Sequence, residues 1–442
     1  MSNVPKIRVI PPGKRGREVI ALDDEYLATS TKTSPVVARR GKGVFVEDVD
    51  GNLYLDFTSG IGVLNTGHCH PKVVEAVQRQ TAELMHFAGT DFYYERQAVL
   101  ARRLTEITPG NHLKKVFFTN SGTESIEAAI KVAKWSTQRK QFIAFLGGFH
   151  GRTAGAGALT ASKPVQRERF FPLMPGVTHL PYAYCYRCAY KMTYPDCDLW
   201  CAKTIEETYL STVLPPDEVA ALFVEPIQGE GGYIVPPKGY LAELKRIAER
   251  HGFLFVDDEV QAGFARTGRM FAIEHFGVVP DIIALAKGMG SGLPIGACIL
   301  RAELDFGVKG AHSNTYGGNL VACASALATI DVILKEKLMK NAERMGKVLG
   351  KRLLELYNTH EIVGDVRGMG LMQVVEYVKS RRTKSYAPDY RDDVVELAYK
   401  NGLLLLPCGR SGIRLIPPLI VNEEQIHAGM EILESCMKKA GH

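Results

Sequence analysis

From Lys115 to about Leu300, short apolar segments alternate with stretches that have helical periodicity. The apolar segments are bounded by turn residues and lie at 116–119, 142–146, 221–225, 254–257, 282–285 and 297–300. Such segments are typical of strands in a sheet that helices cover on both faces. The alternation therefore predicts an α/β fold with a mostly parallel sheet. Because ligands of such sheets bind beyond the carboxyl ends of the strands, the residues that follow each strand are the first candidates for a site.

The two flanks of this region have their own patterns. Residues 1–40 are polar and basic and predict an irregular arm, whereas Asp50-Gly51 between two apolar segments predicts a β-hairpin. Helices are expected at about 71–84, 93–107 and 319–335, and the last of these leads to a C-terminal domain. In that domain we expect helices at 341–357, 392–399 and 423–437 and strands at 362–367, 371–377, 403–406 and 413–416.

Composition and charge argue against several classes of protein. The 442 residues include 54 basic and 48 acidic ones, and the net charge of +6 contains no long basic run, so we expect no nucleic-acid partner. The longest aliphatic run, 403–406, is far too short to span a membrane. Since no apolar segment follows the basic residues near the N-terminus, we expect no signal peptide and a cytoplasmic location.

Three segments that follow strands carry residues with distinctive chemistry. Ser121-Gly122-Thr123 opens a helix and could bind a phosphate, although alone it is more simply a helix cap. In the acidic run 257–259 one carboxylate could hold a protonated ring nitrogen, and the alternatives are a helix cap or a hard-cation site. Lys287 closes an apolar strand before a glycine-rich turn and could form a Schiff base. Together they supply what pyridoxal 5′-phosphate (PLP) requires of a protein.

Several stretches, taken in order, resemble the class III (ω-type) aminotransferases, which are PLP-dependent transferases of fold type I. They are 64–71, 120–125, 149–153, 225–232, 257–268, 285–288 and 315–319, and the resemblance extends from Val44 to the C-terminus. It implies a mostly parallel seven-stranded sheet covered by helices, with a smaller α+β domain built from both termini. The expected division is an N-terminal arm and hairpin (1–70, part of the small domain), a large PLP-binding domain (71–325) and a C-terminal small domain (326–442).

The resemblance also implies a role for individual residues. Lys287 would form the Schiff base and move the substrate proton, and Asp258 would pair with the pyridine nitrogen. Thr315 would reach the phosphate of the partner subunit, which implies a homodimer or a larger homo-oligomer. The other expected cofactor-binding residues are Ser121, Gly122 and Thr123 for the phosphate, Gln261 for the ring hydroxyl, and Phe149, with His150 beside it, for the ring face.

Three further residues are assigned to the substrate by the resemblance. Arg152 matches an arginine that binds a substrate carboxylate, and Arg414 matches one that pairs with Glu230 until a substrate α-carboxylate displaces it. The alternative for both arginines is a structural salt bridge. The implied reaction is ping-pong transfer of an amino group from an ω-amino or amino-acid donor, such as 4-aminobutyrate or ornithine, to 2-oxoglutarate or a similar keto acid. PLP-dependent amino-acid racemases and epimerases share the scaffold and are the alternative.

Four cysteines, Cys185, Cys188, Cys197 and Cys201, lie close together in a Tyr-rich insert. Their C-x2-C and C-x3-C spacing is compatible with structural zinc, but the intervening gap is shorter than in the usual zinc finger. Free thiols or disulfides are equally compatible with it. We expect no other metal site.

Two other classes of protein fit the sequence less well. A nicotinamide-dependent dehydrogenase would share the α/β alternation, but no G-x-G-x-x-G opens a helix after the first strand. An inactive relative with a PLP fold would be expected to lack Lys287 or Asp258, and both are present.

Overall fold

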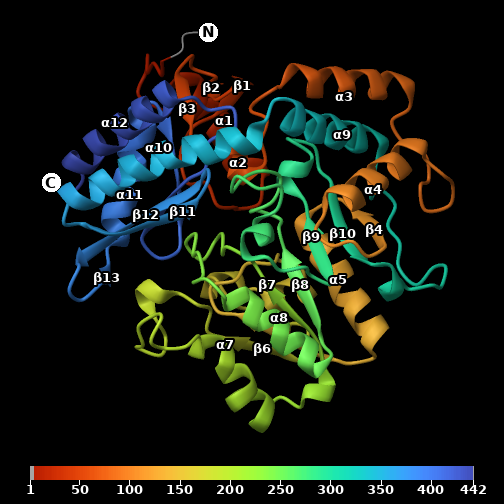
Figure 1. Ribbon diagram of the computed structural model, residues 1–442. Helices are drawn as coiled ribbons and strands as arrows, with labels where there is room; N and C mark the ends of the chain where they lie inside the picture. Colours follow the sequence, from red (N-terminus) through yellow and green to blue (C-terminus); the bar gives the residue numbers. More distant parts are fainter. Residues whose placement is uncertain (1–3, 442) are drawn as a thin grey trace.

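A seven-stranded sheet with the order β4-β10-β9-β8-β7-β5-β6 is the centre of the larger domain in the computed structural model, which describes residues 4–441 (Figure 1). All its pairings are parallel except those of β10 with β4 and β9. The strands are β4 Lys114–Thr119, β5 Gln141–Phe145, β6 Val177–Leu180, β7 Val219–Val224, β8 Leu254–Asp258, β9 Ile282–Leu285 and β10 Gly296–Arg301. The predicted α/β class is confirmed. β6 was not predicted, because this edge strand contains the polar Thr178 and His179.

Alternate residues of these strands enter two separate apolar cores, one on each face of the sheet. Phe142 and Ala144 of β5 share a core with Ile126 of α5 Gly122–Thr137. Ile143 and Phe145 share the other core with residues of α8 Tyr240–His251. Because both faces are covered, the strands β5, β7, β9 and β10 are apolar at nearly every position, which explains why they could be recognised from sequence. Further helices around the sheet are α3 Pro71–Glu83, α4 Glu95–Ile107, α6 Ala154–Leu159, α7 Trp200–Thr204 and α9 Leu320–Lys335.

The smaller domain combines the two ends of the chain, and Figure 1 shows the red and blue segments side by side. The predicted hairpin is present as β2 Phe45–Asp48 and β3 Leu53–Asp56, and β14 Leu403–Leu404 pairs with β3 in parallel. The predicted strand at 403–406 is thus divided between two sheets, since β15 Leu406–Cys408 pairs with β16 Gly412–Leu415. The remaining elements are β11 Val363–Met369, β12 Met372–Ser380, β13 Ser385–Tyr386, α2 Ser59–Gly62, α10 Leu338–Thr359, α11 Pro388–Lys400 and α12 Glu423–Lys439.

The prediction of an irregular arm over residues 1–40 is wrong for its central part. Helix α1 spans Lys14–Tyr26, and β1 Ala38–Lys42 pairs with β2; residues 1–3 lie outside the described part. The carboxylate of Asp50, in the hairpin turn, accepts hydrogen bonds from the backbone N–H groups of Arg15 and Gly16, both at 2.9 Å. The helix is therefore capped by a residue distant in sequence. Because Gly16 is its only buried residue, α1 has no apolar stripe that a sequence pattern could reveal.

Of the two expected domain boundaries, one coincides with the start of a helix and the other lies within a helix. Residue 71 is the first residue of α3, whereas the boundary after residue 325 lies inside α9, which leaves no linker there.

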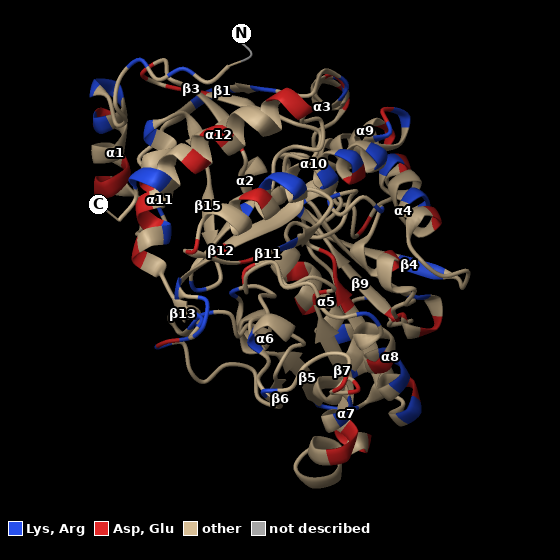
Figure 2. Ribbon diagram, turned by 60° about the vertical axis from the view of Figure 1, so that its left-hand side comes forward, with Lys and Arg blue, Asp and Glu red and all other residues tan. Residues whose placement is uncertain are grey.

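The surface carries charges of both signs. Figure 2 shows Lys and Arg together with Asp and Glu on surface helices such as α4, α9 and α11. In the part of the chain that the structure describes, no helix is long and apolar enough to cross a membrane.

Candidate active site

A cavity of about 490 Å³ lies beyond the carboxyl ends of β4, β8 and β9. Sequence-distant segments meet in its wall, and the wall contains these predicted site residues: Ser121, Gly122, Thr123, Phe149, His150, Arg152, Asp258, Gln261 and Lys287. Glu225 and the segment Leu293-Pro294-Ile295 also line the cavity and were assigned no role from sequence. Glu230, Arg414 and Thr315 do not line this cavity.

The turn between β4 and α5 forms one end of the cavity. Ser121 is the N-cap of α5, and its hydroxyl accepts a hydrogen bond from the backbone N–H of Glu124 at 3.3 Å. The predicted helix cap is thus present, and the same turn leaves Gly122 and Thr123 in the cavity wall. The N-terminus of a 16-residue helix is suited to an anion such as phosphate, because its first backbone N–H groups have no partner within the helix.

The three consecutive acidic residues point in different directions because side chains alternate along a strand. Only Asp258 lines the cavity. Asp257 is buried without a hydrogen-bond partner among the described residues, and burial raises its pKa well above the usual range. Glu259 accepts a hydrogen bond from the backbone N–H of Ile273 at 2.7 Å, and burial raises its pKa to about 8. In residues 4–441 no group of three or more His, Cys, Asp or Glu is placed to hold a metal ion, so the hard-cation alternative has no support.

Asp258 is held by two contacts. Its Oδ2 lies 2.7 Å from Nδ1 of His150, and its Oδ1 accepts a hydrogen bond from the backbone N–H of Val260 at 3.0 Å. Burial opposes protonation of His150, but the hydrogen bond and the negative charge of Asp258 outweigh it and raise the pKa of His150. His150 thus orients the carboxylate of Asp258 and balances its negative charge. A carboxylate has about four acceptor sites, so Asp258 can still accept a hydrogen bond from a ring N–H.

Lys287 follows Ala286, the first residue after β9, and has a φ of +43°. This left-handed conformation is uncommon for a residue with a side chain and is typical of residues that the surrounding structure constrains. Burial lowers the pKa of the Lys287 amine to about 8, against the opposing charge of Asp258. At pH 7 roughly a tenth of the amine is therefore unprotonated and nucleophilic, far more than at the ordinary lysine pKa.

The lowered pKa of Lys287 predicts how this amine would react with the aldehyde of the expected cofactor, PLP. Only the unprotonated amine attacks an aldehyde, so the attachment rate should rise about tenfold per pH unit below pH 8 and level off above it. The rise in absorbance of the visible PLP band, followed after rapid mixing at several pH values, measures this rate. A rate that still increases steeply toward the ordinary lysine value of 10.5 would contradict the pKa. Circular dichroism at each pH is the control for folding.

Glu225 is a residue of the cavity that the sequence analysis missed. Its carboxylate accepts hydrogen bonds from the backbone N–H groups of Phe149, at 2.9 Å, and Gly229, at 2.8 Å. Burial raises its pKa to about 7, against the positive charge of His150. Glu225 directly follows β7, so the rule that site residues follow strands could have found it. Through its two hydrogen bonds, Glu225 joins the backbone of Phe149 to that of Gly229, which directly precedes Glu230.

Glu230 and Arg414 form an ion pair, with 2.6 Å between Glu230 Oε2 and Arg414 Nη2. The other oxygen, Oε1, lies 2.6 Å from Nζ of Lys163. Burial acts to raise the pKa of Glu230, but the two cations outweigh it and the net shift is downward. Nη1 of Arg414 is buried without a hydrogen-bond partner in the described part of the chain. One nitrogen of a buried guanidinium is therefore free for a further acceptor.

The remaining two predicted residues are exposed. The guanidinium of Arg152 lies 5.8 Å from the centre of the Phe149 ring, at the cavity wall. Thr315 lies on an exposed loop before α9, outside the cavity. The expected roles of both residues remain predictions.

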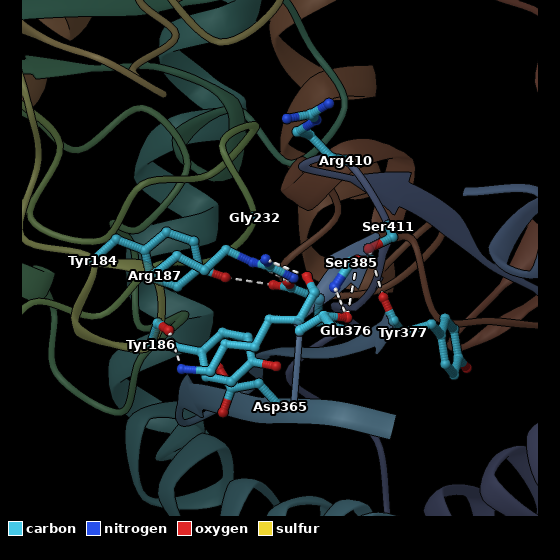
Figure 3. A network of polar contacts seen from close by, with 12 residues as sticks. Tyr184, Tyr186, Arg187, Gly232, Asp365, Glu376, Tyr377, Ser385, Arg410 and Ser411 are labelled. Atoms are coloured by element: carbon cyan, nitrogen blue, oxygen red, sulfur yellow. Dashed lines mark hydrogen bonds and ion pairs between the residues drawn. The ribbon is translucent and has the colours of Figure 1, made fainter. Parts of the chain in front are cut away.

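A network of polar contacts joins the Tyr-rich insert to the small domain and to the segment after Glu230 (Figure 3). Its centre is the buried carboxylate of Glu376, which accepts hydrogen bonds from Arg187 at 2.7 Å, from Arg367 at 2.8 Å and from the hydroxyl of Tyr184. Nη2 of Arg367 also donates to the carbonyl oxygen of Gly232 at 2.6 Å. The insert, the sheet of β12 and the backbone at Gly232 are therefore fixed relative to one another.

The four cysteines of the insert all line one small cavity of about 20 Å³. All four are free thiols, so the disulfide alternative is not realised in this structure. Burial and, to a smaller extent, the neighbouring Cys185, Cys197 and Cys188 raise the pKa of Cys201 to about 12. Among residues 4–441 no group of three or more His, Cys, Asp or Glu is placed to hold a metal ion, and zinc at the four cysteines stays a prediction.

The fold, with these groups at one edge of its sheet, places the chain among PLP-dependent enzymes of fold type I. Comparison with known protein families identifies the family more closely. The sequence model of the family 'Aminotransferase class-III' matches residues 26–437 of this chain. The chain therefore belongs to the class III aminotransferase family, and the predicted resemblance is confirmed.

Individual relatives differ in the reaction that their names describe. A 4-aminobutyrate aminotransferase from Mycobacterium leprae is 41% identical over 409 residues, which cover 91% of this chain and 90% of that protein. An alanine/serine racemase from Pyrococcus horikoshii is 40% identical over 442 residues, which cover 98% and 93%. A structure of the omega transaminase from Pseudomonas jessenii in complex with PMP matches with a TM-score of 0.89 at 28% identity, covering 95% of this chain and 97% of that one.

Proposed function

We propose that this enzyme transfers an amino group from an ω-amino donor, such as 4-aminobutyrate or ornithine, to 2-oxoglutarate by a ping-pong mechanism. The observation that carries the proposal is the Glu230–Arg414 ion pair, because it can serve two kinds of substrate in turn. A cytoplasmic location is part of the same proposal.

The residues of the cavity fit PLP. Oε1 of Gln261 is buried without a hydrogen-bond partner in the described chain, and it lines the cavity near Asp258, where a ring hydroxyl would need an acceptor. The N-terminus of α5 would hold the phosphate through Ser121, Gly122 and Thr123, and Phe149 would cover the ring. Lys287 would attach the cofactor covalently. When bound, PLP would supply an electron sink for the electron pair that remains when a substrate C–H bond is broken.

The chain's own residues would carry the proton and orient the charges. The amine of Lys287, with its pKa lowered to about 8, is suited to accept and return a substrate proton near neutral pH. Asp258 would keep the ring nitrogen protonated, and His150 would hold that carboxylate in place through the 2.7 Å contact. Arg152, exposed at the cavity wall, would bind the distal carboxylate of the donor or of 2-oxoglutarate.

The ion pair would select between the two substrates. An ω-amino donor brings no carboxylate next to its reacting carbon, so Glu230 would stay on Arg414 and neutralise it. Glutamate and 2-oxoglutarate carry an α-carboxylate, which would replace Glu230 on the Arg414 guanidinium. A planar guanidinium suits such an exchange because it binds any carboxylate through paired N–H donors.

A second copy of the chain is part of the proposal, with Thr315 reaching the phosphate of the partner's cofactor. Support comes from exposed apolar side chains beside Thr315, because contiguous exposed apolar surface is typical of an interface. The rings of His86 and Tyr316 are 5.0 Å apart, which places the loop after α3 beside this segment. The exposed apolar residues of these two segments are Leu84, Met85, Phe87, Phe92, Tyr93 and Tyr316.

A racemase is the second candidate, and the 40% identical alanine/serine racemase favours it. The two reactions differ in whether an amino acceptor is required. We expect the purified enzyme to consume 4-aminobutyrate or ornithine only when 2-oxoglutarate is present, with one glutamate formed per donor consumed. Chiral chromatography of L-alanine and L-leucine incubated without a keto acid is the parallel assay. Sustained formation of the D-enantiomer, without a requirement for 2-oxoglutarate, would replace the proposed function by the racemase.

A further inference from the structure

Glu230 has two cationic partners, and the second of them, Lys163, has no role in the function proposed above. We propose that Lys163 is a positioning residue that retains the Glu230 carboxylate when a substrate α-carboxylate occupies Arg414. The inference rests on the proposed use of Arg414 by α-carboxylates. It assigns to Lys163 a specific effect on substrates that carry this group.

The two oxygens of the Glu230 carboxylate contact different cations. Glu230 Oε2 lies 2.6 Å from Arg414 Nη2, and Oε1 lies 2.6 Å from Lys163 Nζ. The side chain of Arg414 is 5% exposed and that of Lys163 is 37% exposed. The arginine is therefore fixed inside the protein, whereas the lysine has room to follow a carboxylate that moves. An ammonium group has three donors, so Lys163 can bind both oxygens of Glu230.

The backbone around Glu230 is held, so the movement is confined to its side chain. The carbonyl oxygen of Glu230 accepts a hydrogen bond from the backbone N–H of Gly409 at 2.8 Å. Two residues further on, the carbonyl oxygen of Gly232 accepts from Arg367, which Glu376 holds in turn (Figure 3). Glu230 can leave Arg414 by side-chain rotation alone, and Lys163 determines where it goes.

The energetic reason for a second cation is the burial of Glu230, whose side chain is 19% exposed. Removing one partner of a buried ion pair is costly because the other charge remains without compensation. A substrate α-carboxylate that takes Arg414 would impose this cost on Glu230 if Arg414 were its only partner. With Lys163 in place, Glu230 keeps one ion pair throughout. Lys163 therefore favours the binding of α-carboxylate substrates and has little effect on ω-amines.

The test compares Lys163→Met with Lys163→Arg, which keeps the charge. Each amino-transfer half-reaction is followed separately by the absorbance of the PLP-loaded or pyridoxamine-loaded holoenzyme. We expect Lys163→Met to raise the KM for 2-oxoglutarate and for glutamate about tenfold, with kcat/KM for 4-aminobutyrate within about twofold of wild type, since a lost ion pair of this kind is worth on the order of one power of ten. Lys163→Arg should restore most of the affinity. Lys347→Met, which removes an exposed lysine paired with Glu343, is the matched control.

A double-mutant cycle gives the decisive comparison. In a Glu230→Gln background there is no carboxylate to retain, so adding Lys163→Met should leave the KM for 2-oxoglutarate unchanged. An equal rise in KM for both substrate classes, no rise at all, or a full effect in the Glu230→Gln background would overturn the proposal. If the wild-type enzyme racemises and does not transaminate, the proposed function fails, and the same cycle with the racemised α-amino acid still tests Lys163, since that substrate also brings an α-carboxylate.

Discussion

Lys287→Ala is expected to lower kcat for amino transfer by at least about 10³-fold, because it removes both the covalent attachment and the group that moves the substrate proton. The amine belongs to the same cavity wall as Asp258, and burial lowers its pKa to about 8. Steady-state assays with 4-aminobutyrate and 2-oxoglutarate measure the loss. A borohydride-treated wild-type enzyme, digested and analysed by mass spectrometry, should carry the pyridoxyl mass on Lys287.

The control for this variant is Lys347→Ala, which removes a lysine from the exposed face of α10. It should keep wild-type activity and the visible PLP band. If Lys287→Ala retained both the band and the activity, or if a different lysine carried the label, the assignment of the cofactor site would be wrong.

Asp258→Asn is expected to lower kcat by about 10²- to 10³-fold while the protein still folds, since it removes one preorganised charge from the reacting centre. An amide in place of the carboxylate cannot favour a protonated ring nitrogen, and it also withdraws the anion that raises the pKa of His150. Single-turnover kinetics with the amino donor isolate this effect from product release. The spectrum of the bound cofactor should change as well, because the ring loses its ionic partner.

The neighbouring residue provides a matched control. Asp257 is on the same strand and fully buried, but it does not line the cavity, and its carboxyl has no hydrogen-bond partner among the described residues. Asp257→Asn should therefore leave single-turnover rates within about threefold of wild type. If both variants lost the same amount of single-turnover activity, the effect of Asp258→Asn would come from damage to the strand and not from the loss of a partner for the ring nitrogen.

The central sheet and the cavity could be predicted from sequence because they depend on local patterns. Each buried strand is short and apolar, and the polar residues that follow it are brought to one edge by parallel pairing. Ser121, the acidic run 257–259 and Lys287 were found in this way, and the resemblance then singled out Asp258. Ser121, Asp258 and Lys287 do line one cavity. The Glu230–Arg414 contact came from the resemblance alone, because 184 residues separate the two positions in the chain.

What could not be predicted depends on contacts between distant residues. Helix α1 is exposed and is capped by Asp50, so neither an apolar stripe nor a local cap marks it. The contact between Lys163 and Glu230 joins two loops, and no periodicity connects them. The relation of His150 to Asp258 was missed for a similar reason, because strand order had to be known before the two residues could be placed together.

The pairing of β3 with β14 has a consequence for how the protein is made. β3 ends at Asp56, whereas its partner begins at Leu403, close to the other end of the chain. During synthesis the early hairpin leaves the ribosome long before its partner exists, and at ordinary translation speeds the interval is on the order of tens of seconds. Throughout that time the edge of β3 beyond Leu53, which pairs with Lys6, is an open template for other strands. The nascent chain is therefore exposed to incorrect pairing at that edge until Leu403–Leu404 has been made.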